Sequence, residues 1–367
     1  MLISIVYTIL IFSAISGILA FLLVIADLLF ANYGECTINI NNKKELKVKG
    51  GSSLLDLLNE NKIYLASACG GRGSCGFCKC NVISGGGPLL PTEKPFLNPE
   101  ETKENMRLAC QIKVKEDIKI KIPEDIFNVK KYKAEVKEIV DLTYDIKELT
   151  LKLIEPDSID FKAGQYVQFV APPYEKSKQA VSRAYSISSS PDNNDHIQLI
   201  IRLVPDGICT TYVFEYLKVG DKVDFTGPFG DFFIRDTKAD MLFVAGGSGK
   251  APIKSMVEYL FKRNSNRRMV YMFGARVRKD LYYVDYFKEF EKKLPDFTFV
   301  PVLSQPTEEC EWKGKCGYIP PFFPEYIKDP SKTEAYLCGS PGMIAAVVKG
   351  LKENGVPEDK IYYDSFA

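Results

Sequence analysis

Residues 69–80 read CGGRGSCGFCKC and contain four of the ten cysteines in this 367-residue chain. Another cysteine, Cys110, follows in the strand-like segment RLACQI. A C-x5-C-x2-C run with a fourth cysteine about thirty residues later suits a 2Fe–2S cluster, because four thiolates must converge on two irons. Glycine lets the loop wrap closely around such a cluster. The predicted iron ligands are therefore Cys69, Cys75, Cys78 and Cys110.

Zinc is the main alternative for this loop. Structural zinc sites usually combine two matched cysteine pairs, whereas the loop has one C-x2-C pair and no obvious second pair. A disulfide framework is disfavoured because the cysteines cluster too tightly in a chain of this size. Five of the six other cysteines are interpreted as packed thiols that behave as small hydrophobic residues; these are Cys36, Cys80, Cys209, Cys310 and Cys316.

Residues 2–30 form an almost unbroken apolar run in which Asp27 is the only charge. About 20 apolar residues span a bilayer as a helix, so the run predicts a single-pass anchor. A cleaved signal peptide is disfavoured because a basic region and a clear cleavage site are both missing. Lys43, Lys44, Lys47 and Lys49 follow, and the positive-inside rule then places the rest of the chain in the cytoplasm, at the inner membrane. Asp27 is expected at the membrane interface.

Strand-like segments with frequent turn signals run from about Tyr132 to Ile234 and predict a small antiparallel barrel. Within it, residues 182–192 read SRAYSISSSPD. Arg183 could clamp a diphosphate, Tyr185 could cover a flavin ring, and the Ser186 hydroxyl could bond to flavin N5. Alternation along a strand sends Arg183 and Tyr185 to one face and Ser186 to the other.

Two later segments strengthen the flavin prediction. Residues 200–214 place Arg202 before a Gly207 turn, and the following Thr210 and Thr211 could cradle phosphate. Residues 227–233 read GPFGDFF, a tight turn back to the sheet. Three spaced motifs in this order favour a flavin site over an ordinary barrel.

From Asp240 onward, strands and helices alternate, which predicts a parallel sheet with helices on both faces. The strand 241–245 runs into GGSGKAP, where glycines allow a pyrophosphate to approach the start of a helix. A P-loop is excluded because Ala251 stands where Ser or Thr should hold magnesium. The candidate dinucleotide residues here are Gly246, Gly247, Gly249 and Pro252.

Two further loops follow strand ends that are expected at the same edge of the sheet, where ligands bind in open α/β folds. One contains Gly274 and Arg276, and the other reads CGSPGM. The second loop contributes the candidate residues Cys338, Gly339, Pro341 and Met343. Cys338 is expected where nicotinamide meets flavin, although a strand-end thiol can also be merely buried.

These motifs resemble the ferredoxin–NADP reductase superfamily fused to a ferredoxin, and more closely the F subunits of sodium-translocating NADH:quinone reductase. The resemblance rests on the cysteine loop, RAYS, GPFGDFF, GGSGKAP and CGSPGM, and covers essentially the whole chain. Two departures stand out: residues 172–181 are shorter than the family's insertion before RAYS, and Gly339-Ser340-Pro341 replaces the family's Gly-Pro-Pro. The shorter segment puts docking in the same complex in doubt.

The resemblance implies an α+β multidomain chain with four parts. They are a transmembrane helix over 1–33, a β-grasp 2Fe–2S ferredoxin domain over 34–126, an antiparallel FAD-binding β-barrel over 127–237, and an α/β parallel-sheet NADH-binding domain over 238–367. It also implies FAD rather than FMN. In the superfamily a terminal aromatic can cover the flavin, which makes Phe366 a candidate gate; sealing the sheet edge is the alternative. Asp364 could pair with Ser186 beside flavin N5.

The function implied is that of an Na⁺-transporting NADH:quinone oxidoreductase subunit, with electrons passing from NADH through FAD to the 2Fe–2S cluster. Other membrane subunits of a respiratory complex would be its partners and a quinone such as ubiquinone the final acceptor. NADH is favoured over NADPH because Asp280 would repel the extra phosphate, although Arg276 and Arg278 lie nearby. The alternatives are a reductase component of a membrane-bound oxygenase or other multicomponent enzyme, and a non-catalytic binding module.

Composition agrees with this interpretation. The net charge of +1 gives no electrostatic reason to expect a nucleic acid partner. The single histidine, His196, disfavours chemistry that needs a histidine base and is interpreted as a solvated loop residue. Hydride transfer from NADH to a flavin requires no acid–base residue.

Overall fold

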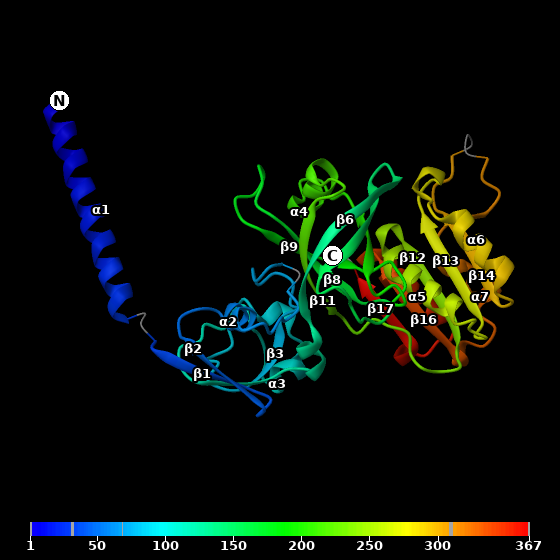
Figure 1. Cartoon of the computed structure of the whole chain (residues 1–367), viewed down its shortest axis with the longest axis horizontal. Coiled ribbons are helices and arrows are strands. Elements are labelled where there is room, and N and C mark those ends of the chain that lie inside the picture. Colours follow the sequence, from blue (N-terminus) through cyan, green and yellow to red (C-terminus); the bar gives the residue numbers. More distant parts are fainter. Residues whose placement is uncertain (1, 31–32, 68, 308–310, 366–367) are drawn as a thin grey trace. The chain divides into compact units, whose positions relative to one another are not determined.

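The computed structural model describes residues 2–30, 33–67, 69–307 and 311–365, and the chain divides into two compact units, residues 1–128 and 129–367. The first unit opens with one continuous helix, α1 (Leu2–Phe30), drawn in dark blue in Figure 1. Side chains along α1 are described at residues 7, 9–22, 24 and 25. Across the part of the chain that the structure describes, no helix is both long and apolar enough to cross a membrane.

The rest of the first unit is a five-stranded mixed sheet in the order β2-β1-β5-β3-β4, in which β1 and β5 run parallel. Asn41 and Asn42 both adopt left-handed conformations between β1 and β2, as the two central residues of a type I′ turn do. Ser53 caps α2 by accepting from the Asp56 N–H at 3.1 Å. The elements are β1 (Glu35–Ile40), β2 (Lys44–Lys49), α2 (Leu54–Glu60), β3 (Lys79–Ser84), α3 (Pro99–Lys103), β4 (Met106–Leu108) and β5 (Ile118–Lys121).

The second unit begins with a six-stranded antiparallel sheet in the order β10-β7-β6-β11-β8-β9. A bridge between Ile187, just after β9, and Leu199 on β10 joins its two ends, so the sheet closes into the predicted barrel. His196 is the first residue of β10, so its assignment to a loop was wrong, although its side chain is 31% exposed. The elements are β6 (Lys130–Thr143), β7 (Ile146–Glu155), β8 (Tyr166–Ala171), β9 (Val181–Ser186), β10 (His196–Arg202), α4 (Ile208–Thr211) and β11 (Lys222–Phe229).

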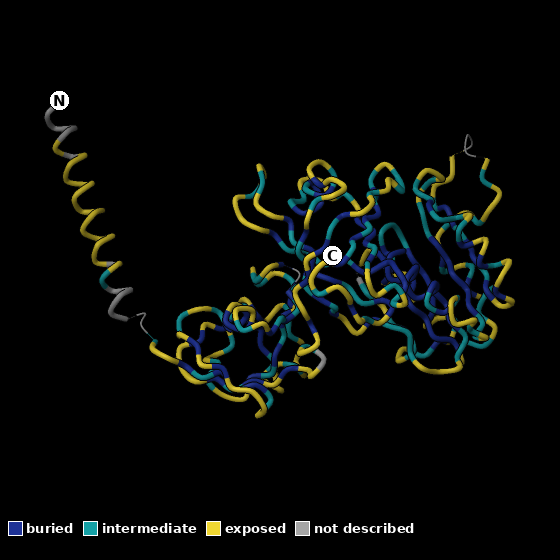
Figure 2. Tube along the Cα trace, viewed as in Figure 1, coloured by how far each residue is buried: buried dark blue, intermediate teal, exposed yellow. Residues whose placement is uncertain are grey.

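A second six-stranded sheet follows in the order β15-β14-β13-β12-β16-β17, with parallel pairing throughout. Helices α5 and α6 pack on one face, and α7 and α8 pack on the other. Figure 2 shows buried residues concentrated along its central strands. The elements are β12 (Asp240–Gly246), α5 (Lys250–Lys262), β13 (Met269–Ala275), α6 (Val284–Lys293), β14 (Phe297–Leu303), β15 (Lys315–Cys316), α7 (Phe323–Tyr326), β16 (Thr333–Gly339), α8 (Pro341–Glu353) and β17 (Ile361–Ser365).

The strand order reverses at β12. Strands β13 and β14 follow on one side of β12, whereas β16 and β17 lie on the other. In open parallel sheets this reversal leaves a crevice outside the carboxyl ends of the two central strands, and ligands bind there. The crevice is therefore expected beside Gly246 and Gly339, which end β12 and β16.

Candidate functional site

The thiols of the cysteine loop form two close pairs. The Sγ atoms of Cys69 and Cys75 are 3.3 Å apart, and the Cys78 and Cys110 thiols are hydrogen-bonded to each other. The pairs are near enough for the charge of Cys75 to act on Cys78. Among the described residues, however, no set of three or more metal-ligating side chains already has metal-binding geometry. The predicted ligands thus lie together as pairs rather than as a closed four-sulfur site.

Each pair contains one thiol that loses its proton readily. The hydrogen bond from Cys78 lowers the pKa of Cys110 to about 6. Burial raises the pKa of Cys69, but hydrogen bonds from Ser74 and Cys75 outweigh it and lower the pKa to about 7. The pKa of Cys78 is raised, first by its hydrogen bond to Cys110 and then by burial. Burial raises the pKa of Cys75, so in each pair one thiol is the readier to become the thiolate that iron binds.

The backbone of the loop is shaped by glycine. A Cβ on Gly73 would lie 2.5 Å from the Gln111 amide nitrogen, and one on Gly76 would lie 2.9 Å from the Phe96 Cβ. Both glycines also have positive φ angles, 71° in each case, which other residues rarely adopt. The loop can therefore fold tightly back on itself, as the wrapping of a 2Fe–2S cluster requires.

The other cysteines divide into buried and exposed thiols. Cys80 is 1% exposed in the core of the first unit, and burial raises its pKa to about 12. Cys36 and Cys209 are also buried. Cys316 is exposed, so its interpretation as a packed thiol was wrong; it lies on the two-residue edge strand β15. Cys310 lies outside the described residues.

The ends of β12 and β16 meet closely, at the crevice that the strand order predicts. A Cβ on Gly249 would lie 2.3 Å from the Cys338 carbonyl oxygen, and one on Gly246 would lie 2.5 Å from the Met343 Sδ. A Cβ on Gly339 would lie 3.0 Å from the same sulfur. Loop residues predicted from two separate motifs are thus in mutual contact, and at position 249, where the obstacle is backbone, only glycine fits.

Cys338 lies in this crevice with Asp364 as its neighbour on β17. The thiol is fully buried, and its pKa is raised well above the usual value by burial and then by the charge of Asp364. Burial, followed by the charge of Asp231, raises the pKa of Asp364 to about 6. Ser186 is 3% exposed at the end of β9. Phe366, the candidate gate, lies outside the described residues.

The predicted flavin residues lie on β9, β10 and α4. Arg183 donates to the Ser182 carbonyl at 2.7 Å, and the Tyr185 ring packs edge-on against Phe169, with centroids 6.3 Å apart. The Thr210 hydroxyl bonds to the Val204 and Gly207 backbone, and thereby braces its own loop. Thr211 is 2% exposed. The Thr211 N–H already donates to the Gly207 carbonyl at 2.8 Å, so this residue has no spare backbone donor for a phosphate.

Arg202 connects the barrel to the glycine loop of the second sheet. Its Nε donates to Asp145 Oδ2 at 2.8 Å. Its Nη1 lies 3.5 Å from the position of a Cβ on Gly247. A guanidinium beside this loop is well placed to bind a phosphate group.

The remaining predicted residues lie around the same edge. Arg276 donates to the Tyr144 hydroxyl at 3.0 Å, and its Nε is 3.5 Å from Asp280 Oδ2. Gly274 is the last residue but one of β13, and a Cβ at this position would lie 3.2 Å from the Ile319 Cδ1. Pro252 is buried in the first turn of α5. Pro341 opens α8.

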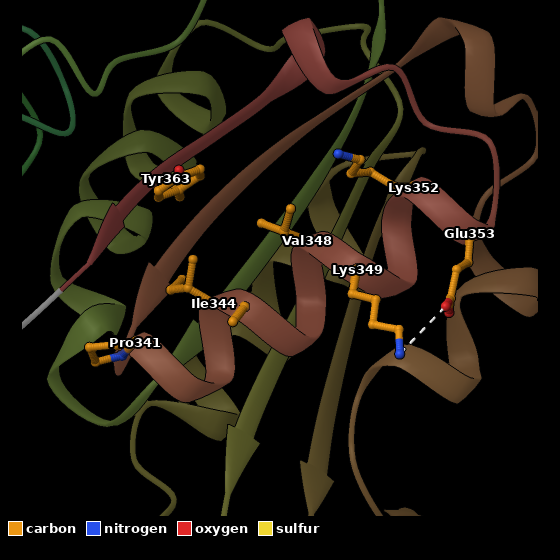
Figure 3. Close-up of a pocket in the computed structure, with 8 residues that line it drawn as sticks. Pro341, Ile344, Val348, Lys349, Lys352, Glu353 and Tyr363 are labelled. Carbon is orange, nitrogen blue, oxygen red and sulfur yellow. Dashed lines mark ion pairs between the residues drawn. The ribbon is translucent and has the colours of Figure 1, made fainter. Parts of the chain in front are cut away.

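An open groove of about 590 Å³ lies elsewhere, between α8 and β17. Figure 3 shows Ile344 and Val348 of α8 facing this space, with Tyr363 of β17 across from them. Side chains alternate along a strand, so Tyr363 and Asp364 point to opposite faces of the sheet. The groove is therefore separate from the Cys338 crevice, although Pro341 lines it.

The sequence reasoning missed a group of buried charged residues. Lys250 is fully buried, and its Nζ donates to the Tyr282 carbonyl at 2.7 Å. Glu148 and Lys254 are 4% and 3% exposed. Charged residues on helices and strands usually face solvent. That Lys250, Glu148 and Lys254 are buried becomes clear only from their partners in the folded structure.

Comparisons with known proteins match each part of this geometry. The model of the 2Fe-2S iron-sulfur cluster binding domain matches residues 38–115, that of the oxidoreductase FAD-binding domain matches 133–234, and that of the oxidoreductase NAD-binding domain matches 243–349. The F subunit of the Na(+)-translocating NADH-quinone reductase of Pseudomonas aeruginosa is 37% identical over 394 positions, covering 97% of each chain. The chain belongs to the family of these F subunits.

A second member of this family, the corresponding protein of Neisseria meningitidis serogroup B, is 36% identical and covers 99% of both chains. Among solved structures, the Amycolatopsis cytochrome P450 reductase GcoB is 28% identical with a TM-score of 0.74, covering 90% of this chain and 98% of its own. The ferredoxin reductase in carbazole 1,9a-dioxygenase is 26% identical with a TM-score of 0.70, covering 91% and 99%.

Membership of this family confirms several predictions. The chain is an NADH-oxidising oxidoreductase subunit with NAD-binding, FAD-binding and 2Fe–2S domains, and its electron path runs from NADH to FAD to the cluster. The individual site residues and the domain boundaries stay predictions.

Proposed function

We propose that this chain is the electron-input subunit of a membrane-bound, Na⁺-translocating NADH:quinone reductase, in which the crevice between β12 and β16 receives NADH. The convergence of Gly246, Gly249, Cys338 and Met343 is the observation that carries the proposal. When bound, FAD converts a two-electron hydride donor into single electrons that a 2Fe–2S cluster can carry. Other membrane subunits would pass those electrons to a quinone.

The protein's own residues would position NADH and hold the cofactors. The glycine loop between β12 and α5 would let a pyrophosphate approach the backbone closely, with Arg202 beside Gly247 as a cation. Arg183, Tyr185 and Ser186 would hold FAD on β9. The paired thiols Cys69/Cys75 and Cys78/Cys110 would ligate the two irons.

Anaerobic addition of NADH to the FAD- and cluster-loaded chain tests this proposal. Flavin absorbance should bleach first, and the spectrum of a reduced 2Fe–2S cluster should follow. Cluster reduction without prior flavin bleaching would contradict the proposed order. Reconstitution with partner membrane subunits should couple NADH oxidation to quinone reduction. If no quinone is reduced, only the NADH-oxidising activity of the proposal is supported.

We also propose that α1 anchors the chain in the inner membrane as a single span, with the other domains in the cytoplasm. The support is the apolar sequence of residues 2–30 and the four lysines that follow it. A helix of this length would extend about 43 Å, against a hydrocarbon core of about 30 Å. One helix cannot form an ion pathway, so any Na⁺ translocation would belong to partner subunits.

Deleting residues 2–33 tests the anchor. The truncated chain should leave the membrane fraction, while the full chain should resist carbonate extraction. Retention of the truncated chain in membranes would mean that partner subunits, rather than α1, hold it there.

A second candidate is a reductase component of an oxygenase. It is favoured by the likeness to the Amycolatopsis reductase and the carbazole dioxygenase reductase over about nine-tenths of the chain. Co-purification from native membranes separates the two functions, because quinone-reductase subunits support the first and an oxygenase supports the second.

A further inference from the structure

A buried polar network joins the barrel to the parallel-sheet domain within residues 129–367. The Tyr283 hydroxyl donates to Glu148 Oε1 on β7 at 2.5 Å. Lys254 on α5 donates to Gln198 Oε1 on β10 at 3.0 Å and to the Ser188 carbonyl at 3.3 Å. The Ser255 hydroxyl donates to the Ser189 carbonyl at 2.7 Å. These contacts link α5 and the start of α6 to three segments of the barrel.

In this network the ammonium of Lys254 pairs with two carboxylates. Lys254 Nζ lies 2.9 Å from Glu258 Oε1 and 3.6 Å from Glu148 Oε2. The Tyr286 hydroxyl donates to Glu258 at 2.7 Å. Desolvation cancels much of the attraction in a buried ion pair, so such a network adds little net stability and is better suited to specifying one arrangement.

The backbone at Tyr283 is strained. Its φ of 57° places a bulky, non-glycine residue in the left-handed region at the start of α6. Such a conformation is unfavourable for a residue with a side chain and persists only where its surroundings hold it. The bond to Glu148 on the barrel is one such restraint.

The neighbouring residue, Tyr282, holds the glycine loop. Its hydroxyl donates to the Gly247 carbonyl at 2.7 Å, and its own carbonyl accepts from Lys250 at 2.7 Å. Two consecutive tyrosines thus tie the proposed NADH loop and the FAD barrel to the same short segment of backbone.

We propose that Tyr283 and Glu148 are positioning residues that set the orientation of the NADH-binding domain on the FAD barrel. The inference rests on the assignment of NADH and FAD to these two domains. Neither residue needs to touch either nucleotide; their bond keeps the two binding surfaces at the separation that hydride transfer requires. A misplacement of about 1 Å can cost about 100-fold in rate while leaving binding intact.

Tyr283→Phe tests the inference, with Tyr286→Phe as a matched control. Both changes remove one hydroxyl from a partly buried tyrosine–carboxylate bond, but the Tyr286–Glu258 bond lies within the parallel-sheet domain. Stopped-flow reduction of the full FAD- and cluster-loaded chain gives a limiting rate and a Kd for NADH. Tyr283→Phe should lower the limiting rate about 10-fold or more and change the Kd less than about twofold. Tyr286→Phe should change neither.

Two further measurements test whether the loss of rate comes from the Tyr283–Glu148 bond and from the hydride-transfer step. Glu148→Gln, which keeps an acceptor for the Tyr283 hydroxyl, should retain most of the rate, whereas Glu148→Ala should lose it as Tyr283→Phe does. With NADH deuterated at the transferred position, the isotope effect in Tyr283→Phe should be at least as large as in the wild type, because the loss lies in the hydride step.

The outcomes distinguish a failure of the proposed positioning role from a failure of the proposed NADH oxidation. A wild-type rate in Tyr283→Phe, an equal loss in both tyrosine variants, or a change in Kd alone would overturn the positioning role while leaving NADH oxidation in place. Failure of NADH to reduce the wild-type flavin would instead overturn the function, and the inference with it. Should Tyr283→Phe fail to fold, the two Glu148 variants decide by the same criteria.

Discussion

Asp364 lies directly opposite Cys338 in the parallel register of β17 on β16. The charge of Asp364 acts with burial to raise the pKa of the Cys338 thiol. Cys338 is therefore a neutral thiol at physiological pH, and Asp364 is the group in this crevice that titrates near neutrality.

Asp364→Asn should flatten the pH dependence of flavin reduction. In the wild type the rate should rise through about pH 6, the pKa of Asp364, because a carboxylate stabilises the positive charge that develops on nicotinamide as hydride leaves. At pH 7 the variant should be roughly 10-fold slower. Stopped-flow reduction between pH 5 and pH 8, at saturating NADH, measures this. An inflection that survives in the variant would assign the titration to another group.

The four predicted iron ligands should behave alike. Cys69→Ser, Cys75→Ser, Cys78→Ser and Cys110→Ser should each abolish the 2Fe–2S electron paramagnetic resonance signal, since a hydroxyl is a poor substitute for a thiolate. Cys80→Ser is the control, because Cys80 is buried in the core and lies on β3. Loss of the signal in Cys80→Ser together with its retention in Cys110→Ser would show that the ligand set is wrong.

Lys250→Met should change how stability depends on pH. Burial lowers the pKa of Lys250 well below its usual value, so in the folded state the amine loses its proton at a pH where the unfolded chain still holds it. Between those two pKa values the unfolded chain binds more protons, and wild-type stability rises with pH, by at most about 1.4 kcal/mol per pH unit. The variant lacks this slope.

Melting curves from pH 7 to pH 9.5 should therefore show that the stability of Lys250→Met, relative to that of the wild type, falls as the pH rises. Aromatic faces oppose the loss of charge, since Lys250 Nζ is 3.6 Å from the Phe273 ring centroid. Parallel wild-type and variant profiles would mean that these rings keep the amine charged.

The preference for NADH should depend on Asp280. This residue lies beside Arg276, with Nε and Oδ2 3.5 Å apart, and its charge would repel the extra phosphate of NADPH. Asp280→Asn should raise kcat/KM for NADPH roughly fivefold, equivalent to about 1 kcal/mol of removed repulsion, and leave the value for NADH nearly unchanged. A wild-type chain that already prefers NADPH would refute the assignment.

Local patterns predicted much of this fold. The strands at 241–245 and 335–338 are continuous apolar runs followed by glycine, so their burial and their loops could be foreseen. Asn41-Asn42 and Ser53 carry turn and cap chemistry that depends on near neighbours alone. The cysteine loop could also be predicted locally, because the spacing of its cysteines by itself indicates a 2Fe–2S cluster.

Buried charge could not be predicted in this way. Lys250 follows a glycine turn that would normally leave a lysine in water, and its burial depends on aromatic rings from strands and loops that come later in the chain. Glu148 and Lys254 become partners only when α5 packs on the barrel. The left-handed backbone of Tyr283 has no local sequence signal, because tyrosine adopts that region only where tertiary contacts hold it.

Strand β17 follows every other described element in the chain, and this order has a consequence for biosynthesis. Domains fold as units while the chain emerges from the ribosome, with the earlier ones first. The ferredoxin sheet, which lies in the separate unit of residues 1–128, can therefore form on a nascent chain, whereas Asp364 reaches Cys338 only after residues 361–365 have been translated and have paired with β16. A chain translated only as far as α8 therefore still lacks the carboxylate that lies opposite Cys338.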